Sequence, residues 1–188
     1  MHSYAGIGSR DITQAEESKI IRIADYLFKK GYFLYSGGAD GADSAFERGC
    51  HGYGLKYLPW SNFNNKVISN IYSTVVHSEN SFESVRRYHP APDALSPAAN
   101  KLMSRNYFQV NGVGDFPKVD FVICCADPIR GSEEVKGGTG QAVRIALDLN
   151  IPVFNIRANN SYWESFLNRL PIVEYSSRSE IENSLCLV

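Results

Sequence analysis

Short apolar runs alternate with longer amphipathic stretches over most of the chain. Five of these runs have the length and the β-branched or aromatic content of strands. They are Ser3–Gly8, Tyr32–Tyr35, Leu55–Leu58, Val119–Cys125 and Ile151–Asn155. Strands that alternate with helices at this spacing predict a doubly wound, mostly parallel sheet flanked by helices, with strand order 3-2-1-4-5. The expected fold class is therefore α/β, as one Rossmann-like domain over residues 1–188.

The helices are predicted from apolar residues at a spacing of three or four and from their end signals. Thr13 with Glu16 three residues on forms a capping box, and the helix that follows runs to about Lys30, where Gly31 ends it. Further helices are expected over about 42–49, 81–88, 97–110 and 161–170, and directly after Gly140. The tail is expected to add a small strand and a helix.

Residues 61–117 do not follow the regular alternation. Asn and Ser are frequent in the first part of this segment, and prolines interrupt its helical pattern. The segment is too long for a plain connection between two elements. It is expected to form a lid or a wall of a binding site within the same domain.

Composition narrows the class of protein. The net charge is −1 and 44% of the residues are hydrophobic, which is typical of a globular domain without an overall basic field for nucleic acid. A local basic groove remains open. There is no apolar run of the roughly 20 residues that a membrane span needs, and no signal peptide is recognisable. The four cysteines form no C-x-x-C pair. These features predict a cytoplasmic protein without disulfides, metal or cofactor.

Glycine-rich turns follow three of the predicted strands. Gly8-Ser9-Arg10 follows the first strand, Gly37–Gly41 the second, and Gly137–Gly140 lies between the fourth strand and a helix. Unpaired backbone N–H groups at a helix start suit a phosphate or another anion, and glycine allows a close approach. With strand order 3-2-1-4-5, the first and third of these turns face one crevice at the point where the strand order reverses. The sequence therefore predicts an anion site there.

Several familiar motifs are absent. A dinucleotide fingerprint starting at Gly6 would need a third glycine where Asp11 stands. The chain also has no G-x-x-x-x-G-K-[ST], H-E-x-x-H or G-x-S-x-G sequence. P-loop nucleotidases, zincins and α/β-hydrolases are thus disfavoured.

Four segments carry a resemblance to a known superfamily. They are A-G-I-G-S-R at Ala5–Arg10, S-G-G-A-D-G-A-D at Ser36–Asp43, L-M-S-R-N at Leu102–Asn106 and G-G-T-G-Q-A at Gly137–Ala142. In order and spacing they resemble the SLOG superfamily of Rossmann-like nucleotide-binding proteins, which includes the DprA/Smf and LOG-type proteins. The chain looks most similar to small phage-encoded DprA-like proteins. The resemblance implies a nucleotide-type ligand.

The resemblance also suggests roles for single residues. Arg105 matches an arginine that lies near the phosphate in both groups, and a guanidinium can hold a phosphate bidentately. The catalytic glutamate of LOG enzymes would fall near Val143 or Arg144, and neither can act as that acid. Any catalysis would need another carboxylate, for which Asp40, Asp43 and Glu47 are the nearest and Asp40 is the best placed by strand order. Trp60 follows the third strand, where it could stack on a base or simply cover the sheet edge.

The expected function is binding of a phosphorylated nucleotide or a nucleotide-derived small molecule, such as an ADP-ribose-type signal. One alternative is a nucleotide N-glycosidase with a relocated carboxylate, and another is single-stranded DNA binding in recombination. A homo-oligomer is expected from the resemblance and from the segment 61–117, which is rich in Phe, Tyr and Leu that one domain is not expected to bury fully. The residues expected to contact the ligand are Gly8, Ser9, Arg10, Gly37, Gly38, Asp40, Trp60, Arg105, Gly137, Gly138, Thr139, Gly140 and Gln141.

Overall fold

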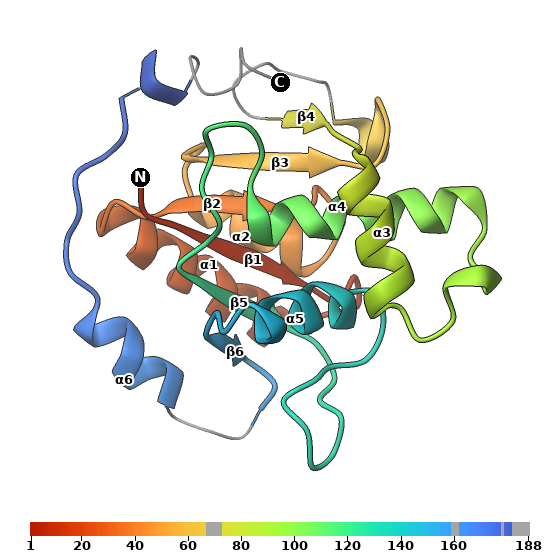
Figure 1. Ribbon diagram of the computed structural model, residues 1–188. Coiled ribbons are helices and arrows are strands. Elements are labelled where there is room, and N and C mark those ends of the chain that lie inside the picture. The colour runs from red at the N-terminus through yellow and green to blue at the C-terminus, as the bar shows by residue number, and fades with distance from the viewer. Residues whose placement is uncertain (67–72, 159–161, 178, 182–188) are drawn as a thin grey trace.

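The sheet is parallel throughout and divides the helices into two layers (Figure 1). The computed structural model describes residues 1–66, 73–158, 162–177 and 179–181. In this part of the chain the sheet has six strands in the order β4-β3-β2-β1-β5-β6. The strands are β1 (Ser3–Gly8), β2 (Phe33–Ser36), β3 (Gly54–Leu58), β4 (Ser73–Val75), β5 (Phe121–Cys125) and β6 (Val153–Asn155). The five predicted strands and their order are confirmed, in a single α/β domain.

The two faces of the sheet are covered by different helices. α1 (Gln14–Lys29), α2 (Ala42–Gly49) and α6 (Tyr162–Arg169) pack on one face, where Tyr4, Leu34 and Phe46 are buried. α4 (Pro97–Asn111) and α5 (Thr139–Asp148) lie on the other face, against Ile7 and Tyr35. α3 (Glu79–Tyr88) packs on α4, as Figure 1 shows. None of the described helices has the length and apolar content needed to cross a membrane.

The predicted end signals act as expected in the first helix. The Thr13 hydroxyl accepts a hydrogen bond from the Glu16 amide, and the Glu16 carboxylate accepts one from the Thr13 amide, which completes the capping box. Gly31 follows the helix with a φ of +86°. This left-handed conformation is open to glycine, because a side chain there would be strained.

The described part of the segment 61–117 contains more regular structure than its pattern indicates. It contributes the edge strand β4, the 3₁₀ turns η1 (Phe63–Asn65) and η2 (Pro92–Ala94), and helices α3 and α4. β4 was not predicted, because three residues at a sheet edge are too few to give a periodic pattern. In the tail, residues 171–177 hold no strand, although Val173 donates a hydrogen bond to the Lys30 carbonyl. The expected C-terminal helix falls on 179–181 and otherwise on residues outside the described part.

Candidate functional site

A cleft of about 500 Å³ opens at the carboxyl edge of the sheet. It lies where the strand order reverses, because β1 and β5 are hydrogen-bonded neighbours with Gly8 opposite Cys125. The turn at Gly8–Arg10 and the turn at Gly137–Thr139 both line this cleft. Helix α4, which belongs to the segment 61–117, forms the wall that faces these two turns.

The structure brings together some of the residues predicted for the site and separates others. Gly8, Ser9, Arg10, Arg105, Gly137, Gly138 and Thr139 line the cleft. Gly37, Gly38, Asp40, Trp60, Gly140 and Gln141 do not.

The residues outside the cleft have other surroundings. Gly37 lies beneath the Arg105 side chain, and Gly140 and Gln141 are buried in the first turn of α5. Asp40 is exposed and lines a separate hollow. Trp60 packs edge-to-face on Phe63, in a small apolar cluster with Ala39 and Leu58. The core-lid alternative for Trp60 therefore matches its position.

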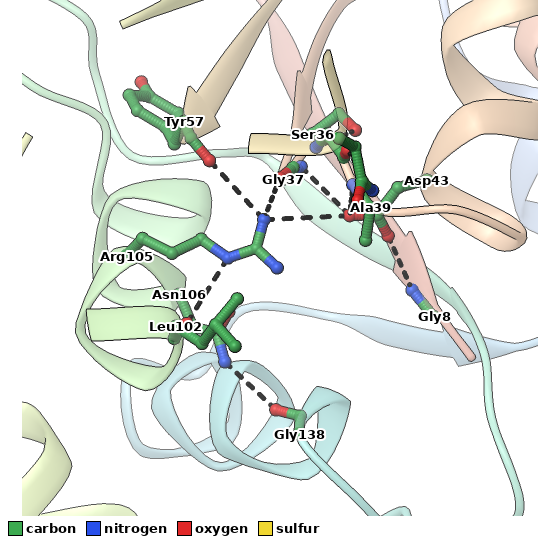
Figure 2. A network of polar contacts seen from close by, with 12 residues as sticks. Gly8, Ser36, Gly37, Ala39, Asp43, Tyr57, Leu102, Arg105, Asn106 and Gly138 are labelled. Atoms are coloured by element: carbon green, nitrogen blue, oxygen red, sulfur yellow. Dashed lines mark hydrogen bonds and ion pairs between the residues drawn. The ribbon is translucent and has the colours of Figure 1, made fainter. Parts of the chain in front are cut away.

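Asp43 joins the two glycine turns that follow β1 and β2. Its carboxylate accepts hydrogen bonds from the amides of Gly8 (3.1 Å), Gly37 (3.2 Å) and Ala39 (3.3 Å), as Figure 2 shows. The side chain is buried, and this burial raises the pKa of the Asp43 carboxyl to about 6, although Arg105 and the amide bonds oppose the shift. The three amide hydrogen bonds and Arg105 favour the ionised form of Asp43, and through these bonds Asp43 fixes the shape of both turns.

Arg105 is the counter-ion of this carboxylate, at 3.8 Å from Nη1 to Oδ2. Nη1 also donates to the carbonyls of Gly37 and Tyr57, and Nε donates to the Leu102 carbonyl at 3.3 Å. In Figure 2 the other terminal nitrogen, Nη2, carries no such contact. A bidentate grip on a phosphate needs two free nitrogens. In this arrangement two of the three Arg105 nitrogens hold backbone carbonyls, so Nη2 is the nitrogen left for a ligand, and a phosphate contact of Arg105 stays a prediction.

The start of α5 offers free donors at the opposite wall. Gly140 and Gln141 donate to the carbonyls of Gly137 and Gly138. The amides of Gly138 and Thr139 have no acceptor among the described residues, and no side chain caps the helix. Such amides, together with the helix dipole, attract an anion.

The cationic side chains of the cleft fall into two groups. Arg105 is paired with Asp43, whereas Arg10 and Lys136 are exposed and form no ion pair with any described residue. Lys136 precedes the α5 turn directly, and Arg10 lies near enough to lower the pKa of Arg105. These two cations are free to meet a ligand.

Arg157 holds the rim of the cleft together. It contacts the carboxylates of Glu16 (2.7 Å) and Asp127 (2.8 Å), and Nη2 donates to the Asp11 carbonyl (2.7 Å). The hydrogen bond from Arg157 lowers the pKa of the Glu16 carboxyl to about 2. One side chain thus joins the loops after β1, β5 and β6, and it is neutralised by its partners.

The position matched to the LOG glutamate faces away from the cleft. Val143 is fully buried in the core between α5 and the sheet. Arg144 donates to the Tyr88 carbonyl (2.6 Å) and contacts Glu134 (3.0 Å). The carboxylates that line the cleft are Asp11, Asp43 and Asp127.

Sequence reasoning missed several residues of the cleft. Asn106, Gln109, Lys136 and Arg157 line it. Asn106 and Gln109 follow Arg105 by one and four positions, so helical periodicity could have placed Gln109 on the same face. Arg157 follows the last strand, which is also a carboxyl end. Lys136 directly precedes the Gly137–Gly140 turn, and a cation beside a helix start is itself a signal of an anion site.

Comparisons with known proteins identify the fold. No protein-family model matches the chain, and no curated protein matches it. DNA processing protein A from Helicobacter pylori, whose structure is described in terms of single-stranded DNA binding, is similar with a TM-score of 0.55 and 19% identity, over 98% of this chain and 80% of that one. The structural-genomics target TM1055 gives 0.55 and 17%, over 96% and 89%.

DNA processing protein A from Streptococcus pneumoniae gives a TM-score of 0.53 with 14% identity, over 93% of this chain and 59% of that protein. At these identities the likeness concerns the fold alone. The chain therefore shares the Rossmann-like fold of DNA processing protein A and TM1055.

Proposed function

We propose that the cleft binds a phosphorylated, nucleotide-type small molecule. The observation that carries this proposal is the meeting of the free Gly138 and Thr139 amides with two unpaired cations, Arg10 and Lys136, in one concave site. A phosphate fits such a set, because it accepts several hydrogen bonds and carries the opposite charge. The Thr139 hydroxyl adds a further donor.

The shape and charge of the cleft favour a small ligand over a long nucleic acid strand. A volume of about 500 Å³ is in the range of small-molecule sites. Arg105 and Arg157 are neutralised by carboxylates, and Arg10 and Lys136 share the cleft with the carboxylate of Asp11, so the surplus positive charge is small. Binding of a nucleic acid strand depends on many phosphate contacts, and one local cationic site contributes little to it.

Three observations favour binding over N-glycosidic hydrolysis. The position matched to the LOG glutamate is the buried Val143, and Asp40 faces a different hollow. Asp43 lines the cleft, but its oxygens are held by three backbone amides. A carboxylate that is held in this way keeps the loops in place and is poorly positioned to act in hydrolysis.

The experiment is calorimetric titration of the protein with AMP, ADP-ribose and adenosine. We expect AMP and ADP-ribose to bind and adenosine to bind at least tenfold more weakly. Lys136→Ala and Arg10→Ala should each weaken AMP binding roughly tenfold, since a charged hydrogen bond contributes about 1.5–3 kcal/mol. The control is Lys118→Ala, an exposed lysine outside the cleft. Equal affinity for AMP and adenosine would contradict the proposal.

A further inference from the structure

Gln109 is a buried polar side chain without a partner. It lines the cleft from α4 and is only 2% exposed. Its amide makes no hydrogen bond with any described residue, although its nitrogen lies close to Gly37. The amide is not among the fully enclosed unpaired polar atoms of the described residues, so it stays open to the cleft and available to a ligand.

Asn106 stands one helical turn before Gln109 on the same face of α4. Residues three apart on a helix are neighbours, and their backbone positions differ by about 4.5 Å along the axis. The Asn106 nitrogen donates to the Gly138 carbonyl at 3.0 Å, so this side chain touches the start of α5. Its oxygen accepts no hydrogen bond from a described residue. The free polar atoms thus extend from the anion site towards Gln109.

The free atoms of this wall include both donors and acceptors. The Asn106 oxygen and the Gln109 oxygen are acceptors, whereas the Gln109 nitrogen and the Arg105 Nη2 are donors. A carboxylate or a second phosphate would place charge against the two acceptors. Hydroxyl groups fit better, because each one can donate to an oxygen and accept from a nitrogen.

We propose that the Asn106–Gln109 wall recognises the two ribose hydroxyls of a ligand whose phosphate lies at the start of α5. This inference rests on the proposed function, and it makes Gln109 the residue that determines specificity for ribose. A sugar directly attached to the phosphate lies within a few ångströms of it, which is the separation that one helical turn provides. Specificity follows because a ligand without the hydroxyls leaves the buried amide unpaired.

The test compares AMP with 2′,3′-dideoxy-AMP, which keeps the base and the phosphate. We expect the wild-type protein to bind AMP at least tenfold more tightly than the dideoxy analogue in calorimetric titrations. Gln109→Leu should reduce AMP binding to the level of the analogue and leave binding of the analogue unchanged. Gln14→Leu makes the same chemical change on the exposed start of α1 and should alter neither affinity.

Thermal unfolding separates recognition from a structural role. Because the Gln109 amide is unpaired, leucine should keep or raise the melting temperature, by about 2–6 °C. A lower melting temperature with an unchanged preference for AMP would assign Gln109 to the core and overturn the inference.

The two proposals fail in different ways. If neither AMP nor its analogue binds, the proposed function fails. If both bind equally to the wild-type protein, the phosphate site stands and the ribose inference is overturned, a result that requires no variant. A Gln109-dependent preference among AMP, GMP and CMP without loss on removing the hydroxyls would assign the wall to the base and also overturn it.

Discussion

Replacing Arg105 with alanine should destabilise the protein far more than the same change at an exposed surface arginine would. The change removes the counter-ion of Asp43 and leaves the carbonyls of Gly37, Tyr57 and Leu102 without this donor. Breaking a buried ion pair by removing one partner costs about 3–5 kcal/mol, since the remaining charge is uncompensated. That is a large share of the roughly 5–15 kcal/mol by which a domain is stable.

The loss should depend on pH in a defined direction. The folded pKa of Asp43 is already raised to about 6 from 3.8, and removing Arg105 takes away an interaction that lowers it. A carboxyl with a raised folded pKa favours the native state below its unfolded pKa, and stability is lost as the pH rises through the folded value. The destabilisation by Arg105→Ala should therefore be larger at pH 8 than at pH 5, where Asp43 can take up a proton.

The assay is urea denaturation followed by tryptophan fluorescence at pH 5 and pH 8. Arg130→Ala, in an exposed loop, is the matched control and should change the free energy of unfolding by less than about 0.5 kcal/mol. Adding Asp43→Asn to Arg105→Ala should remove most of the pH dependence. A loss below about 1 kcal/mol, or the same loss at both pH values, would refute the buried-pair reasoning.

The remaining predictions concern the rim, catalysis and assembly. Arg157→Ala should lower the free energy of unfolding at pH 7 by about 1–2 kcal/mol after allowance for solvent screening. The pKa of Glu16 is about 2 in the folded protein against an ordinary value of 4.5, so this difference between variant and wild type should vanish as the pH falls from about 4 towards 2 in an acid-denaturation series. Nucleoside monophosphates should not release free base at the rate of about 1 per second that is typical of enzymes, as chromatography would show, whereas rapid release abolished by Asp40→Asn would contradict this. Light scattering should show a homo-oligomer, and a stable monomer at micromolar concentration would disprove it.

Most of the fold could be predicted because its signals are local and repeated. The inner strands are mostly apolar and mostly buried, and β5 is buried at every position. The capping box at Thr13 and the glycine turns mark where helices begin and end. β4 was not predicted because it is a run of only three residues. It is a strand because it pairs with β3, and this pairing leaves no local pattern in the sequence.

The sequence allowed us to predict where the site lies, but not which side chains face it. Strand order brings the Gly8 and Gly137 turns to one edge, and this follows from topology without any knowledge of side chains. Where a side chain points is a different matter. Gly37 and Asp40 belong to the same glycine turn, yet one is buried under Arg105 and the other faces solvent.

Arg105 and Gln109 show why side-chain roles needed the structure. An arginine beside a phosphate site and an arginine bonded to backbone carbonyls look the same in a sequence, and only the position of Asp43 distinguishes them. Because Asp43 neutralises Arg105, the positive charge for a ligand must come from Arg10 and Lys136. The same pairing leaves Gln109 beside a committed guanidinium, with its own amide unpaired. The buried wall is thus polar but nearly neutral, and this property is what suits it to hydroxyl groups rather than to a second phosphate.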